Sequence, residues 1–217
     1  MKTDTQLQRD VIEELGWDAA INAAQIGVSV KDNIVTLSGD VGSYGEKWNA
    51  ELAAQRVSGV RGIAVDIRVT LPGSGRRSDV DIARAAENVL QWTAMLPLNG
   101  VKVLVENGWV TLSGEVDWDY QRQSASSAVR YLMGVTGISD QIALKAVVSA
   151  NTVKTDIEAA LKRRAKDDAK NIVVEVRGTE VILSGTTHSW AESELARRAA
   201  WGAPGVRQVV DHISIAN

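Results

Sequence analysis

The chain has 217 residues, of which 45% are hydrophobic and 24% charged, so it can build folded domains rather than remain disordered. Because cysteine is absent, disulfides, thiol nucleophiles and zinc sites with thiolate ligands are excluded. The net charge of -3 and the presence of only two histidines, His188 and His212, predict no metal site, no cofactor and no nucleic-acid partner.

The sequence contains no segment with the roughly 20 consecutive apolar residues that a membrane-spanning helix needs. Its first residues are polar and lack the apolar stretch of a secretory signal. We therefore expect a soluble cytoplasmic protein, or a periplasmic one if a leader has been removed.

Three similar segments follow one another along the chain. The string VTLSG at residues 35–39 recurs at 110–114, and as VILSG at 181–185, at offsets of 75 and 71 residues. The same offsets, applied without gaps, align most other apolar positions. We therefore predict three repeated domains, at residues 1–71, 78–149 and 151–217.

Each repeat opens with a helix and continues with two strands. Apolar residues at Leu7, Val11 and Leu15 form one helical stripe, which returns in the other two copies. Two alternating segments follow, joined at 32–33, 107–108 and 178–179 by residues that tolerate positive φ, as in tight hairpin turns.

A second helix and a last strand complete the repeat. The second helix of the first copy has small residues on one face, at Ala50, Ala53 and Ala54, which lets its backbone lie close to a sheet. The order α-β-β-α-β predicts an α+β fold with two helices on one face of a three-stranded mixed sheet. Glycines recur at the strand end and after the second helix: Gly39, Gly114 and Gly185, then Gly59, Gly134 and Gly205.

These motifs resemble the BON domain, a bacterial family. The resemblance rests on the VTLSGxV strand end, on Gly-Val some 20 residues later and on the final Val/Ile strand, and it covers the chain as three tandem copies. The first copy matches most closely, whereas Thr186, Thr187 and Gln208 depart from the pattern in the third.

The resemblance implies a non-enzymatic protein associated with the cell envelope, with osmotic stress and with phospholipid binding at membrane surfaces. The shared residues are glycines and core aliphatics, so it supplies no catalytic residues.

The polar residues offer little chemistry of their own. Ser38, Ser113 and Ser184 each precede the glycine that recurs at the strand end, but the first two copies contain no histidine that could act as a base. We interpret them as turn serines bonded to local backbone, and His188 as structural or solvated rather than the base of a hydrolase. The acidic group Glu115, Asp117 and Asp119 lacks the ligand spacing of a calcium loop.

Two groups of residues are candidate contact sites. A basic cluster near the end of the third copy's first helix is a candidate contact for anionic lipid. It comprises Lys162, Arg163, Arg164, Lys166 and Lys170. Aromatic residues near the start of each second helix favour packing between domains over insertion at a lipid interface, so we expect that edge to be buried or to face a partner. They are Tyr44, Trp48, Trp118, Tyr120 and Trp190.

The sequence therefore predicts a binding or scaffold protein without catalytic activity, linked to osmotic or envelope stress. Its expected partners are a phospholipid surface, another protein or a second copy of itself. The alternative is a soluble intracellular protein that binds a small solute or cation in a cleft between domains.

Overall fold

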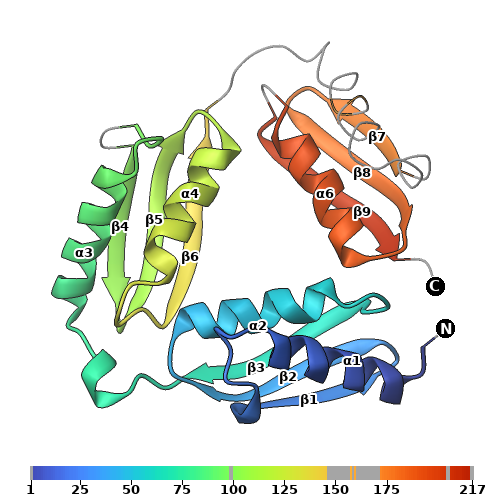
Figure 1. Cartoon of the computed structure of the whole chain (residues 1–217). Coiled ribbons are helices and arrows are strands. Elements are labelled where there is room, and N and C mark those ends of the chain that lie inside the picture. Colours follow the sequence, from blue (N-terminus) through green and yellow to red (C-terminus); the bar gives the residue numbers. More distant parts are fainter. Residues whose placement is uncertain are drawn as a thin grey trace.

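The computed structural model describes residues 2–97, 100–145, 157, 159, 172–203 and 206–215. Within these ranges the chain forms three separate three-stranded sheets, one in each repeat, which we call units 1, 2 and 3 (Figure 1).

The elements follow the predicted order. Unit 1 contains α1 (Asp4–Trp17), β1 (Ile26–Lys31), β2 (Ile34–Val41), α2 (Tyr44–Arg56) and β3 (Gly62–Val69), with a short 3-10 turn, η1 (Ala23–Gln25), before β1. The turn η2 (Gly73–Gly75) leads to unit 2, which contains α3 (Asp79–Trp92), β4 (Val101–Glu106), β5 (Trp109–Val116), α4 (Asp119–Arg130) and β6 (Gly137–Leu144). Unit 3 contains β7 (Ile172–Arg177), β8 (Glu180–Thr187), α6 (Trp190–Trp201) and β9 (Gln208–Ile215).

Each sheet is mixed, as the sequence predicts. In unit 1 the central strand β2 pairs antiparallel with β1 and parallel with β3, so Val35 lies between Val30 and Ile63. Units 2 and 3 repeat this pairing in the same register. The α+β fold with tandem mixed sheets is therefore confirmed.

The core of each unit lies between its sheet and its helices. In unit 1, Leu7 and Val11 of α1 and Leu37 of β2 are fully buried. Ala50 and Ala54 of α2 are also fully buried, so a thin alanine face brings the helix backbone close to the sheet. Ile157 is buried in the core of unit 3 and Ala159 is half-buried, whereas the remaining residues of the predicted first helix there lie outside the described ranges.

Two kinds of turn depend on unusual backbone angles. Asp32 and Asn33 have φ of 52° and 64°, so the first predicted hairpin turn uses left-handed residues. Gly39 has φ of 134°, and a Cβ added there would collide with the carbonyl oxygen of Gln25. Gly114 and Gly185 have similar angles, Gly59 and Gly134 are also left-handed, and Gly205 lies outside the described residues.

A carboxylate at the start of the first helix supports each of the first two hairpins. Asp4 accepts hydrogen bonds from the backbone N–H groups of Asp32 and Asn33, at 3.0 and 3.1 Å. In unit 2 the matching Asp79 accepts from Asn107 and Gly108, at 2.8 and 2.9 Å. Asp4 and Asp79 are thus equivalent acidic residues with the same role, and the serines are not the only polar residues that recur between units.

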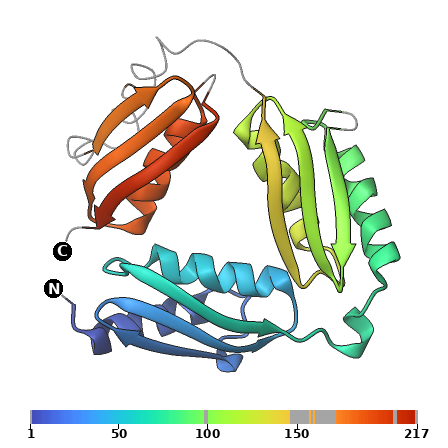
Figure 2. The same ribbon diagram turned by 180° about the vertical axis from the view of Figure 1, so that it is seen from behind.

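The three units lie along the sides of a triangle (Figure 1). All the described helices lie toward one face of the triangle, and the sheets form the opposite face, which Figure 2 shows from behind. Helices α2, α4 and α6 lie on the inner sides, so the second helix of every unit is the one turned toward the other units.

Replacing Asp79 with alanine is expected to destabilise unit 2 by about 1 to 2 kcal/mol, because two turn N–H groups lose a charged acceptor. Calorimetric unfolding measures the loss. Glu87→Ala, an exposed change on the same helix, is the control and should leave the melting temperature nearly unchanged. Equal shifts for the two variants would show that Asp79 does not support the turn.

Candidate functional site

The junction between units 1 and 2 is built around the aromatic residues of α2. Tyr44 packs against the core of unit 2. The guanidinium of Arg130, the last residue of α4, lies 3.9 Å from the centroid of the Trp48 ring. A cation above an aromatic face is attracted by the negative potential of the ring, so this contact joins the two units.

The residue after α4 completes this junction. The hydroxyl of Tyr131 donates a hydrogen bond of 3.2 Å to Oδ1 of Asn49. A Cβ added at Gly45 would lie 2.5 Å from Cδ1 of Tyr131, so only glycine leaves room for the ring at this position in α2. Glycine lowers helix stability by about 1 kcal/mol relative to alanine, and the close approach of Tyr131 accounts for its presence.

The junction between units 2 and 3 uses the same parts of the helices. The ring of Trp201, at the end of α6, packs against the cores of both units. Arg122, in the first turns of α4, lies above it at 4.4 Å. Nearby, Nε of Arg207 donates a 3.1 Å hydrogen bond to the carbonyl of Leu144 at the end of β6.

Both junctions follow one arrangement, in which the end of a second helix packs onto the start of the second helix in the preceding unit. The offset of 71 residues places Trp201 at the position of Arg130. The cation therefore comes from the helix end in one junction and from the helix start in the other. The partners are exchanged, but the cation–π contact is kept.

The five aromatic residues singled out from the sequence do not share one environment. Tyr44 and Trp48 lie in the first junction, whereas Trp118 and Tyr120 are 37% and 51% exposed, so that a partner at this edge of unit 2 stays a prediction. Trp190 is half-buried and lines a cavity between units 1 and 3. The junction residues Arg122, Arg130, Tyr131 and Trp201 were not among those singled out from the sequence.

Two ionisable side chains near the first junction, Glu51 and Tyr44, are partly desolvated. Burial raises the pKa of the Glu51 carboxyl above its usual value, and the nearby Lys47 ammonium partly offsets this. Burial also raises the pKa of the Tyr44 hydroxyl, with a further contribution from the Glu51 carboxylate. A charged Glu51 therefore costs stability at neutral pH.

The other candidate residues serve the local structure. Asp119 pairs with Arg122, and Asp117 pairs with Lys145 at 3.2 Å, so these carboxylates do not converge on a common cation. Within the ranges that the structure describes, no group of three or more metal-ligating side chains occurs. Ser38, Ser113 and Ser184 lie inside strands β2, β5 and β8 rather than in turns.

A second set of recurring polar residues supports the second helices. Glu46 accepts hydrogen bonds from the backbone N–H groups of Asn22 and Gly42, at 2.9 and 3.1 Å. The matching Gln121 and Glu192 accept from the N–H groups just before α4 and α6. These side chains satisfy the orphan donors of helix starts, so their recurrence reflects the fold.

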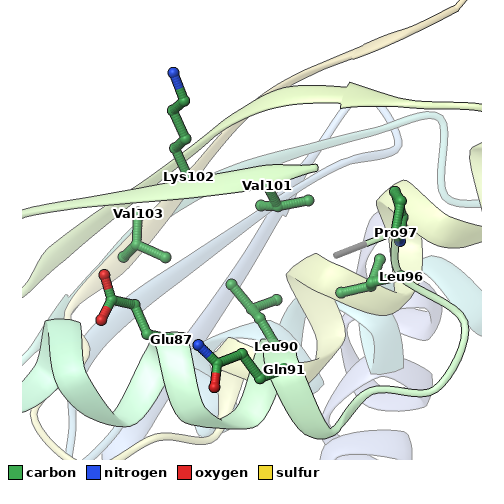
Figure 3. Close-up of a pocket in the computed structure, with 8 residues that line it drawn as sticks. All are labelled: Glu87, Leu90, Gln91, Leu96, Pro97, Val101, Lys102 and Val103. Carbon is green, nitrogen blue, oxygen red and sulfur yellow. The ribbon is translucent and has the colours of Figure 1, made fainter. Parts of the chain in front are cut away.

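A cleft of about 400 Å³ lies between α3 and β4 in unit 2 (Figure 3). Its floor is apolar, with Leu90, Leu96 and Val103 directed into it, while Lys102 points away to the other side of the sheet. Glu87 and Gln91 are the polar side chains of α3 beside it. An apolar floor with a few polar groups at its rim is typical of small-molecule clefts.

The basic cluster at 162–170 lies outside the described residues. Among the described helices, none has both the length and the hydrophobicity required to cross a bilayer.

A double-mutant cycle tests the contact between units 1 and 2. We expect Arg130→Met and Trp48→Leu to show a coupling free energy of about 0.5 to 1 kcal/mol, because either change alone removes the cation–π contact. Calorimetric unfolding of both single variants and the double variant gives this value. Arg84→Met combined with Trp48→Leu is the control cycle, and a coupling equally large there would contradict the assignment.

Glu51→Gln is expected to raise the melting temperature at pH 7 to 8. A carboxyl with a raised native pKa stabilises the fold when protonated and loses that contribution as the pH rises through this pKa. The gain from glutamine should therefore shrink as the pH falls toward about 4, where carboxyl groups take up protons. Calorimetry across this range measures the effect, with the exposed Glu13→Gln as the control. A gain independent of pH would show that Glu51 ionisation is not its cause.

Comparison with characterised proteins gives a relative in Escherichia coli (strain K12), osmotically-inducible protein Y. The two sequences are 30% identical over 129 residues, which make up 58% of this chain and 64% of the relative. The chain thus spans less than two thirds of that protein in the match.

Two solved structures of CdsD, a structural protein of the Type III secretion system of Chlamydia trachomatis, also align with the chain. The first covers 96% of this chain and 91% of its own, with a TM-score of 0.28, and the second, of the C-terminal domain, covers 100% of both, with a TM-score of 0.26. Both are 12% identical to this chain, and at these scores no likeness of fold follows.

The model of the BON domain matches the chain three times, at residues 3–70, 78–146 and 149–217. Together these matches span nearly the whole sequence. The chain therefore belongs to the BON domain family, of which it carries three tandem copies.

Proposed function

We propose that this chain is a non-enzymatic binding protein, linked to osmotic or envelope stress, that docks on anionic phospholipid surfaces through the ends of its first helices. Its family and its similarity to an osmotically-inducible protein support the stress association.

A pair of exposed tryptophans supports the choice of a lipid surface. Trp17 is the last residue of α1 and Trp92 the last residue of α3, and the repeat offset of 75 makes the two positions equivalent. Both side chains are 88% exposed, more than any other large apolar residue in the described ranges. Tryptophan is favoured at the interface between lipid headgroups and acyl chains, so a recurring exposed tryptophan supports contact with a membrane surface.

The third copy carries charge at the matching sequence position. Adding the second offset of 71 to Trp92 leads to Arg163, which lies within the basic cluster. The three equivalent positions therefore provide two aromatic residues and one cluster of cations. Cations near an anionic membrane each contribute about 1 kcal/mol to binding, which can offset the weak repulsion expected from a net charge of -3.

The placement of the polar residues supports a role without catalysis. The recurring acids Asp4 and Asp79 hold hairpin turns, and Glu46 with its counterparts holds helix starts. These groups are committed to backbone hydrogen bonds. Binding through exposed surfaces is the role that the remaining side chains support.

Vesicle flotation tests this function. We expect the protein to float with anionic vesicles at low salt and not with neutral ones, with a blue shift of tryptophan emission. The double variant Trp17→Ser with Trp92→Ser should bind about tenfold more weakly, a loss of about 1.4 kcal/mol. Reversal of Lys162, Arg163 and Arg164 to glutamate should abolish binding.

The matched control is Trp109→Ser, because Trp109 is half exposed but lies on strand β5 rather than at a helix end. This variant should bind like the wild type. Vesicle binding that survives both the tryptophan and the charge changes would contradict the proposed surface, and absence of binding at low salt would favour a protein partner.

A further inference from the structure

The two junctions already described predict a third. If the end of each second helix packs onto the start of the second helix in the preceding unit, the end of α2 should meet the start of α6 and close the ring. The structure places α2 and α6 in contact, in agreement with this arrangement (Figure 1). This head-to-tail interface closes after three units.

The third junction lacks the stacked pair of the other two. By the repeat offsets, Gln55 occupies the position of Arg130, and Glu194 occupies the position of Trp48. These two side chains include neither a cation nor an aromatic ring, so they cannot form a cation–π contact. A cavity of about 370 Å³ lies here, lined by Arg61 of unit 1 and by Trp190, Glu194 and Arg197 of unit 3, and a cavity of about 380 Å³ lies beside Arg130 and Tyr131 at the junction of units 1 and 2.

Arg61 shows that an attachment point exists but is not used. Its counterpart in unit 3 is Arg207, which donates to the carbonyl of Leu144 at the end of β6. In unit 3 the residue equivalent to Leu144 is Ile215, at the end of β9. Arg61 and Ile215 both line the cavity. Yet the Arg61 side chain is exposed and has no hydrogen bond or ion pair within the described part of the chain.

The acids beside the cavity are already engaged. Glu194 pairs with Arg197 and Arg198, and Asp211 accepts a 3.1 Å hydrogen bond from the hydroxyl of Ser193. The cavity therefore offers no carboxylate in need of a cation, and we interpret it as incomplete packing between two units rather than as a ligand site.

We propose that units 1 and 3 form a latch, a junction that opens and closes while the other two stay closed. Units 1 and 2 are connected directly by the chain, as are units 2 and 3, so a short linker keeps each of those pairs at high effective concentration. Units 1 and 3 are at the two ends of the array and have no such link. The junction without a stacked pair is therefore also the one that can separate without stretching a linker.

Distance measurements between spin labels test the latch. Because the chain has no cysteine, two introduced cysteines carry the only labels. Glu13→Cys with Val173→Cys reports on units 1 and 3, and Glu13→Cys with Leu104→Cys reports on units 1 and 2; all three positions are exposed. We expect two distance populations for the first pair and one for the second, independent of protein concentration.

A designed variant closes the latch. Gln55→Arg with Glu194→Trp places the Arg130–Trp48 combination at the third junction and should raise the ratio of closed to open molecules about tenfold. Gln55→Arg with Glu194→Ala is the matched control, which has the cation but no ring and should raise it less.

Three results would overturn the proposal. One is a single narrow distance for units 1 and 3 in the wild type, since the junction would then stay closed. Another is an equal spread for both labelled pairs, because opening would not be specific to this junction. The third is a long-distance population that grows with protein concentration, which would indicate association with a second copy.

Discussion

The second helix of each unit is packed on two sides at once, and the arrangement of the whole chain depends on this constraint. One face must be nearly flat to lie against its own sheet, which is why Ala50, Ala53 and Ala54 are fully buried in unit 1. The two ends of the helix remain available, and large or charged side chains there contact the neighbouring units. The alanine face of each second helix packs within its own unit, whereas the large side chains at the helix ends contact the neighbouring units.

This division of roles explains which features the sequence predicted. The hairpin turn at Asp32 and Asn33 and the alanine face of α2 are local patterns that recur in each copy, so the fold and the three repeats could be recognised without a structure. The junctions could not be, because Arg130 and Trp201 occupy the same repeat position with opposite roles. A search for recurring residue types passes over a contact in which the two partners change places. Asp4 and Asp79 were missed for another reason, since the turn N–H groups they bind are far away in sequence.

The repeat also separates residues that maintain the fold from residues that vary in role. Positions fixed by backbone geometry keep their residue type, as Gly39 and Gly114 do where a Cβ would collide with a carbonyl oxygen. The exposed residues that end the first helices of units 1 and 2 are Trp17 and Trp92, whereas the matching sequence position in the third copy is Arg163. Surface positions without such a constraint can thus differ in residue type between copies while the fold stays the same.

Because the cation and the ring change places between the two junctions, the side chains at the helix ends also determine the order in which the units must follow one another. If units 2 and 3 were transposed, Trp201 would meet Trp48 in place of a cation, and Gly202 would face Gly45 where Tyr131 now fills the space. The domains share one fold but are not interchangeable, because each helix end is complementary to one particular neighbour. A change at one side of a junction therefore constrains the residue on the other, and the three copies must diverge as adjoining pairs rather than one by one.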